Sequence, residues 1–202
     1  MITVHHLNAS RSSRVLWLLE ELKIPYNVVA HQRDTTTQLA PKSLHKIHPL
    51  AKAPIIVDGD ITLGESGAIV EYILNSDPQN RLRPSTKSLE YCHYLEWLHF
   101  AEGSLALPVI SSVLMNMENR DGLQPMDAYI AKELALDFSY IEATLANRAY
   151  FAGNEFTAAD IMMTIMLDIA AKMGLLVDRT NTLAYLSKMH SRSAYKTAAS
   201  LG

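Results

Sequence analysis

The order of apolar patterns in the first thirty residues most constrains the fold. The β-branched start Ile2–Val4 precedes a helical apolar pattern over Val15–Leu22, and a second β-rich run, Tyr26–Ala30, begins just after Pro25. Parallel neighbours need a crossover connection, and such crossovers are almost always right-handed. A strand, a helix and a strand in so short a span therefore predict a parallel pair with a right-handed crossover.

The next segment predicts a hairpin and a further helix. Pro41 suits the first turn of a short helix. The apolar runs Ala53–Val57 and Ile61–Leu63 flank the Asp58–Asp60 turn, whose D-G pair favours antiparallel strands. A helical pattern follows over Gly67–Asn75. The resulting order, β-α-β-α-β-β-α, is typical of an α/β thioredoxin-like domain, which we assign to residues 1–78.

The second half of the sequence predicts helices and no strand. A polar linker with prolines, residues 79–85, separates the first domain from an all-helical domain over residues 86–202. The expected helices are Thr86–Met117 with a bend at Pro108, Pro125–Leu145, Thr157–Lys172, Thr182–His190 and a short tail helix.

Composition excludes several classes of protein. The formal charge of −3 and the absence of a basic stripe argue against nucleic-acid binding. One cysteine, Cys92, makes neither an internal disulfide nor a redox pair. The apolar stretch Gly103–Met117 is shorter than the ~20 residues of a membrane span, and the start is no secretory signal, so we expect a cytoplasmic protein. His45 and His48 lack a third ligand nearby, so no metal is expected.

Serines occupy the place where thioredoxins carry their redox cysteines. Ser10, Ser12 and Ser13 lie at the expected start of the first helix. A helix N-terminus carries partial positive charge, and a hydroxyl there can donate to a thiolate and lower the thiol pKa. The alternative is that these serines only cap the helix.

Two further segments offer groups for a small peptide. Pro54, at the expected start of a strand, is a candidate for a cis bond that would expose the Ala53 backbone to a peptide ligand, although it also suits an ordinary strand start. Glu65 and Ser66 would accept an ammonium and bind a carboxylate, although Ser66 also suits a helix N-cap. Together the three segments fit a peptide thiol with an amino-acid end.

Over nearly its whole length the chain resembles the glutathione S-transferases. The resemblance rests on four segments in order: Ser10–Leu22, His48–Pro54, Asp58–Ile69 and Phe156–Ile161. Because His5–Asn8 contains no tyrosine, the chain is most similar to serine-type bacterial and fungal members. It departs from the family in Ala51, where glycine is common, and in Ser193, where proline is common.

The resemblance implies a role for each matching residue. Ser10 would activate the glutathione sulfur, Ser12 is the second candidate for that role, and Asn8 would line the same pocket. The implied glutathione contacts are Lys52 to the glycine carboxylate, the Ala53 backbone beside cis-Pro54, and Glu65 and Ser66 to the γ-glutamyl end. The acceptor pocket would include His99, Phe100, Glu102 and Ser104.

The Phe156–Ile161 segment has a structural basis. Thr157 and Asp160 have the spacing of a capping box, in which each side chain accepts from the backbone of the other residue. From the sequence alone, Asp160→Ala should destabilise the protein by about 1–2 kcal/mol without a direct effect on catalysis.

The implied activity is attack by the glutathione thiolate on an apolar electrophile, with glutathione as co-substrate, no metal, and a homodimer as the expected assembly. Two alternatives stay open: a mainly glutathione-dependent peroxidase, and a non-catalytic binding or partner-interaction module of the same fold. A serine hydrolase is disfavoured, because Gly64–Gly67 lacks the G-x-S-x-G spacing.

Overall fold

The computed structural model describes residues 1–201, which form two compact units. One unit comprises residues 1–81 together with the stretch from residue 191 onward, and the other comprises residues 82–190. The tail helix therefore belongs to the first unit, not to the all-helical domain that the sequence predicts over residues 86–202.

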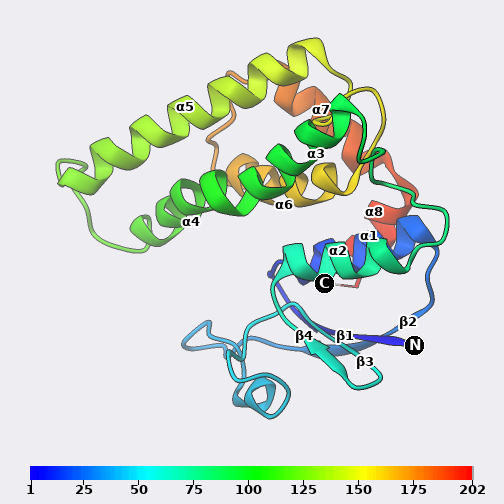
Figure 1. Cartoon of the computed structure of the whole chain (residues 1–202). Helices are drawn as coiled ribbons and strands as arrows, with labels where there is room; N and C mark the ends of the chain where they lie inside the picture. Colours follow the sequence, from blue (N-terminus) through cyan, green and yellow to red (C-terminus); the bar gives the residue numbers. More distant parts are fainter. Residues whose placement is uncertain (202) are drawn as a thin grey trace. The chain divides into compact units, whose positions relative to one another are not determined.

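The first unit is a four-stranded sheet with helices (Figure 1). Its elements are β1 (Ile2–Leu7), α1 (Ser12–Leu22), β2 (Tyr26–His31), the 3-10 helix η1 (Lys42–Lys46), β3 (Ile55–Asp58), β4 (Ile61–Leu63), α2 (Ser66–Ser76) and α8 (Ser193–Ala199). The strand order is β2-β1-β3-β4. β1 pairs with β2 in parallel, and β3 is antiparallel to both β1 and β4. The thioredoxin-like fold, the parallel crossover and the hairpin are confirmed.

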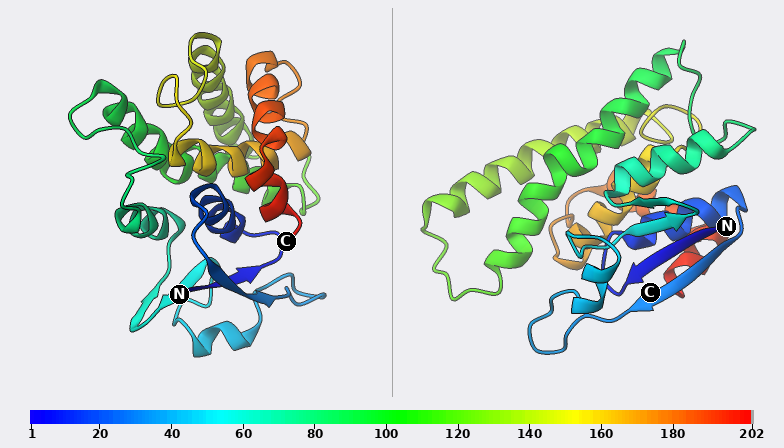
Figure 2. Two further views of the ribbon diagram at one scale, coloured as in Figure 1. Left: turned by 90° about the vertical axis from the view of Figure 1, so that its right-hand side faces the viewer. Right: turned by 60° about the horizontal axis from the view of Figure 1, so that its bottom comes forward.

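Helices cover one face of this sheet and η1 lies on the other (Figures 1 and 2). α1 packs on β1 and α2, and its fully buried Val15, Leu16 and Leu18 belong to the core of the unit. On the η1 side, Leu44 packs with Ile55. The sheet thus holds the end of β1 and the start of β3 in fixed positions beside the N-termini of α1 and α2.

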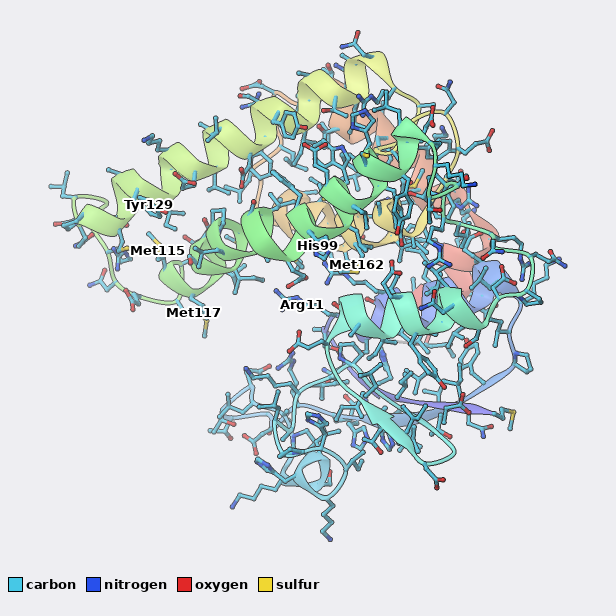
Figure 3. All side chains as sticks on the ribbon, viewed as in Figure 1. Arg11, His99, Met115, Met117, Tyr129 and Met162 are labelled. Carbon is cyan, nitrogen blue, oxygen red and sulfur yellow. The ribbon has the colours of Figure 1, made fainter. Side chains whose placement is uncertain are left out.

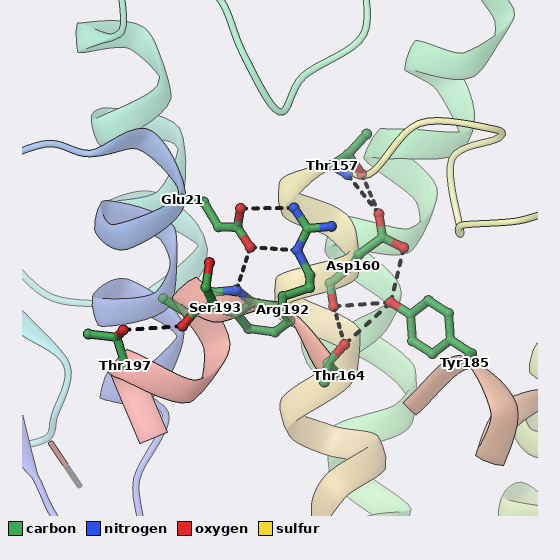
Figure 4. Close-up of polar contacts among 9 residues, drawn as sticks. Glu21, Thr157, Asp160, Thr164, Tyr185, Arg192, Ser193 and Thr197 are labelled. Atoms are coloured by element: carbon green, nitrogen blue, oxygen red, sulfur yellow. Dashed lines mark hydrogen bonds and ion pairs between the residues drawn. The ribbon is translucent and has the colours of Figure 1, made fainter. Parts of the chain in front are cut away.

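Charge pairing and ring contacts attach the tail to α1. Arg192 donates two hydrogen bonds to the Glu21 carboxylate, at 2.6 and 2.9 Å (Figure 4). Trp17 also donates to Glu21, at 2.9 Å, and its ring meets Tyr195 edge-on with centroids 5.0 Å apart. A bidentate arginine–carboxylate pair is geometrically specific, which explains why the tail packs here.

The second unit is all-helical in its described residues. Its elements are α3 (Leu89–Phe100), a π-helical turn η2 (Ala101–Leu105), α4 (Ala106–Met115), α5 (Pro125–Asn147), α6 (Ala158–Lys172) and α7 (Thr180–Ser191). The sequence predicts a bend at Pro108; the structure has a π-helical turn, η2, just upstream of that residue. Proline lacks the N–H for the carbonyl four residues earlier and crowds it, and a π-turn accommodates this conflict. By length and composition alone, Leu89–Met115 could cross a membrane, a test that core helices of soluble proteins also pass.

The core of this unit is built around α6 and an aromatic cluster. α6 is buried on nearly every side, as expected of a helix that is apolar all round. The Trp97 ring lies 4.6 Å from the Phe151 ring and 4.8 Å from the Tyr140 ring, between centroids.

Candidate active site

Ser10 and Ser12 lie where β1 gives way to α1, and their surroundings differ. Ser12 is fully buried, and its Oγ lies 2.9 Å from His6 Nδ1, 2.7 Å from Ser10 Oγ and 3.2 Å from the Leu7 amide nitrogen. Ser10 is half-buried, and its Oγ accepts from the Ser12 amide at 3.2 Å. Protein groups therefore surround the Ser12 oxygen, whereas the Ser10 hydroxyl keeps an open side.

The hydrogen bonds of His6 give this serine pair a direction. The imidazole is 3% exposed, and its Nε2 is buried with no hydrogen-bond partner among the residues described. Because a buried N–H without an acceptor is rarer than an acceptor without a donor, we assign the proton to Nδ1. His6 then donates to Ser12, and Ser12 donates across the 2.7 Å contact to Ser10, in preference to the Leu7 carbonyl at 3.3 Å. The Ser10 proton is left to point outward.

The charge state of His6 supports this assignment. Burial lowers the pKa of His6 below its ordinary value, and the nearby His31 lowers it further. The imidazole is thus neutral at pH 7 and carries a single N–H. His6 is a functional candidate that the sequence reasoning missed, although a histidine next to a predicted site in a buried strand was a usable signal.

The segment before β3 has the backbone that a peptide ligand would need. The Ala53–Pro54 bond is cis, as expected. The β1–β3 ladder starts at Ile55, opposite His5, so Ala53 lies just outside it. The Lys52 side chain is exposed, and Ala51 has a φ of +48°, which explains why the family often has glycine there.

The start of α2 differs in one respect from expectation. Ser66 is the first residue of the helix, not its N-cap; Glu65 occupies the N-cap position with a φ of 65°. The Ser66 hydroxyl accepts from Arg14 Nη1 at 3.1 Å, and both side chains are buried. The first amide bonded back into the helix is that of Ile69, to the Glu65 carbonyl. The preceding amides of the turn are therefore available to an anion.

Arg14 is the second residue that the sequence reasoning missed as a site component. It lies on α1 and is fully buried, with a hydrogen bond to Ser66 that fixes the serine rotamer. An arginine within an otherwise apolar helix needs a partner when it is buried. In the sequence, Arg14 lies between Ser13 and Val15 at the start of an apolar helical pattern, and this position was a usable signal. The identity of its partner could not be predicted, because it depends on how α1 packs on α2.

Asn8 contacts a neighbouring loop. Its Oδ1 accepts from the Arg33 amide at 2.8 Å, and the Arg33 guanidinium donates to the carbonyls of Asn8, Ala9 and Gln38. This amide holds the loop after β2, and its role in lining the sulfur pocket stays a prediction.

The four acceptor-pocket candidates lie in different surroundings. Phe100 and Ser104 line a cavity of about 520 Å³ within the helical unit. His99 and Glu102 are exposed and are not among the residues that line it. Their role stays a prediction.

The capping box at α6 is confirmed. The Asp160 carboxylate accepts from the Thr157 amide at 2.8 Å and from the Thr157 hydroxyl at 3.0 Å. It also accepts from the Tyr185 hydroxyl at 3.0 Å (Figure 4) and from the Phe151 amide at 3.0 Å, two partners that the motif does not predict.

Comparison with known proteins identifies the family of the chain. The family model "Glutathione S-transferase, N-terminal domain" matches residues 1–75, and "Glutathione S-transferase, C-terminal domain" matches residues 104–192. "Glutathione S-transferase 3" of Schizosaccharomyces pombe is 36% identical over 178 residues, which are 81% of this chain and 72% of that protein. A glutathione S-transferase structure from Actinobacillus pleuropneumoniae has a TM-score of 0.90 and 31% identity, covering 98% of this chain and 91% of that one. Transferase URE2P8 of Phanerochaete chrysosporium, solved with oxidised glutathione, shares the fold with a TM-score of 0.82 at 20% identity, over 98% and 93% of the chains.

Proposed function

The chain belongs to the glutathione S-transferase family, and we propose that it conjugates reduced glutathione to apolar electrophiles with the help of the Ser10 hydroxyl. In this reaction the glutathione sulfur attacks the electrophilic carbon, the new C–S bond forms, and the leaving group departs with its electron pair. The protein contributes by lowering the thiol pKa and by holding the thiolate beside the acceptor.

The proposed glutathione site lies entirely within the first unit. The γ-glutamyl carboxylate binds at the free amides of α2 and the Ser66 hydroxyl, and Glu65 accepts from the ammonium. The Ala53 backbone pairs with the cysteinyl residue, and Lys52 approaches the glycine carboxylate. The buried Arg14–Ser66 hydrogen bond supports this proposal, because it orients a hydroxyl at a helix N-terminus.

The observation that carries the mechanism is the hydrogen-bonded series His6–Ser12–Ser10. With the proton on His6 Nδ1, each hydroxyl accepts from the previous residue and donates to the next. Ser10 therefore presents its proton to the sulfur, at the N-terminal end of α1. Hydrogen bonds to charged groups contribute about 1.5–3 kcal/mol, which corresponds to a thiol pKa lower by ~1–2 units.

The test compares two serine variants by the pH dependence of conjugation to chlorodinitrobenzene and by the ultraviolet absorbance of the bound thiolate. Ser10→Ala should raise the pH of thiolate formation by ~1–2 units. Ser13→Ala is the matched control, because the Ser13 hydroxyl donates to the Ser10 carbonyl at 3.2 Å and takes no part in the series. Identical profiles for both variants would assign the role to Ser12 or to backbone amides.

The same assay separates the alternatives. Retention on immobilised glutathione without thiolate formation or turnover would indicate a non-catalytic binding module. Turnover of organic hydroperoxides far above conjugation would indicate mainly peroxidase activity. We also propose a cytoplasmic homodimer, for which a sedimentation mass near the 22.5 kDa of one chain would be contrary evidence.

A further inference from the structure

The turn between β1 and α1, residues 8–11, carries Ser10 and passes through a left-handed residue. Ala9 has a φ of +49°, a conformation that is unfavourable for a residue with a Cβ. Such residues persist where contacts with the rest of the protein hold them. Figure 3 marks the end of this turn by Arg11, the N-cap residue of α1. Whatever holds Ala9 therefore also determines the position of the next residue, Ser10.

One residue of the loop after β2 binds this turn. Arg33 Nε donates to the Asn8 carbonyl at 3.1 Å, and Nη2 donates to the Ala9 carbonyl at 3.0 Å. The Arg33 amide also donates to Asn8 Oδ1 at 2.8 Å. Successive carbonyls of an extended strand point to opposite sides, so these two carbonyls converge on one guanidinium because the backbone turns at Ala9. The guanidinium thus binds the conformation that is otherwise unfavourable.

The same guanidinium is fixed on its own loop. Its Nη1 donates to the Gln38 carbonyl at 2.9 Å. The loop closes on Asp34, whose Oδ1 accepts from the amides of Thr36 and Thr37 at 3.0 and 2.7 Å. The planar fork of an arginine holds several acceptors in fixed directions, which a lysine ammonium does not. Arg33 therefore attaches the turn to a compact loop.

The contacts of Ser10 on its other side come from α1. The Ser10 Oγ accepts from the Ser12 amide at 3.2 Å, and the Ser13 hydroxyl donates to the Ser10 carbonyl at 3.2 Å. The helix thus holds Ser10 from one side, and Arg33 holds the residue before it from the other.

We propose that Arg33 is a positioning residue for conjugation: through the carbonyls of Asn8 and Ala9 it keeps the Ser10 hydroxyl where it donates to the glutathione sulfur. The inference rests on the proposed function, in which that hydroxyl stabilises the thiolate. A displacement of about 1 Å at a reacting group can cost ~100-fold in rate, so loss of these hydrogen bonds affects the chemistry. The proposed glutathione contacts belong to residues 52–54 and 65–66, so glutathione binding should be retained.

The test measures the absorbance of the bound thiolate against pH, together with kcat and KM for conjugation to chlorodinitrobenzene, in variants of the whole protein. Arg33→Met keeps the length of the side chain. It should raise the pH of thiolate formation by ~1 unit and lower kcat below that pH about tenfold. KM for glutathione should change far less than kcat.

Three further variants separate positioning from charge and from a general structural effect. Arg33→Lys keeps the charge but not the fork, so it should recover less than half of the shift. In the double variant Ser10→Ala/Arg33→Met the shift should equal that of Ser10→Ala alone, because Arg33 acts through Ser10. Asp34→Ala is the matched control: it loosens the same loop but removes no donor to the turn, so the pH profile should not change.

Retention on immobilised glutathione shows that each variant is folded. If Arg33→Met is not retained, Arg33→Lys decides: an intermediate profile supports the proposal and a wild-type profile overturns it. The proposal is also overturned by a wild-type profile in Arg33→Met, by additive shifts in the double variant, or by an equal shift in Asp34→Ala. In these cases a shift in Ser10→Ala leaves the proposed function standing, whereas its absence is the failure of the proposed function itself and of this inference with it.

Discussion

The structure predicts a larger loss of stability for Asp160→Ala than the sequence motif does. Its carboxylate is fully buried and accepts from four donors: the amides of Thr157 and Phe151 and the hydroxyls of Thr157 and Tyr185. It therefore joins the loop at Phe151, the start of α6 and a tyrosine of α7. A simple helix cap would accept hydrogen bonds only from donors in the first turn of its own helix.

The magnitude of Asp160→Ala follows from what happens to each donor. The Tyr185 hydroxyl lies 3.3 Å from the Thr164 hydroxyl and can donate there instead, and the Thr157 hydroxyl can rotate. The amides of Thr157 and Phe151 have no such freedom. A buried unsatisfied donor costs about 1–3 kcal/mol, so the two amides predict a loss of about 4 kcal/mol, above the 1–2 kcal/mol expected from the motif.

The measurement is urea unfolding followed by circular dichroism and intrinsic fluorescence. The matched control is Asp127→Ala, at the same position of the capping box at α5. The Asp127 side chain is 15% exposed, and water can reach both the Gln124 amide and the Arg120 guanidinium that it now binds, so we expect a loss of about 1 kcal/mol. In thermal unfolding, Asp160→Ala should lower the midpoint by roughly 10 °C.

Equal losses in the two variants would refute the reasoning, because a fully buried cap and a partly exposed cap would then be equivalent. Unchanged stability with lost conjugation would refute it differently, by giving Asp160 a direct part in catalysis.

Three shorter predictions concern the first unit. His6→Asn, which keeps a donor in place of Nδ1, should retain the conjugation pH profile, whereas His6→Leu should shift the profile upward by ~1 unit. Burial lowers the pKa of His5, His6 and His31, so the unfolded chain binds protons first; the free energy of unfolding measured in urea should fall as pH decreases below about 6.5. Constant stability down to pH 5 would contradict this. Ala51→Gly should be neutral or stabilising by up to ~1 kcal/mol at its positive φ, whereas Ala131→Gly, at an exposed position of α5, should cost about 1 kcal/mol in thermal unfolding.

Local sequence patterns predicted much of the fold because their causes are local. The crossover, the Asp58–Asp60 hairpin and the helix from Pro125 each depend on residues close in sequence. The placement of the tail depends on Glu21 and Arg192, which are 171 positions apart. No periodicity in either segment signals that pair. The sequence therefore predicted a helix after residue 191 but not the element on which that helix packs.

In the candidate site too, the sequence predicted what depends on neighbouring residues and did not predict what depends on packing. The resemblance placed Ser10 ahead of Ser12, but the motif gave no physical reason for that order, because both residues precede or begin the same helix. Their difference comes from a third residue, His6, whose strand position puts Nδ1 at 2.9 Å from Ser12 and leaves Ser10 at the open end of the series. The serine that donates outward is thus decided by a neutral histidine beneath it. In the proposed mechanism, a residue outside the motif that identifies the site therefore sets the reactivity of the site.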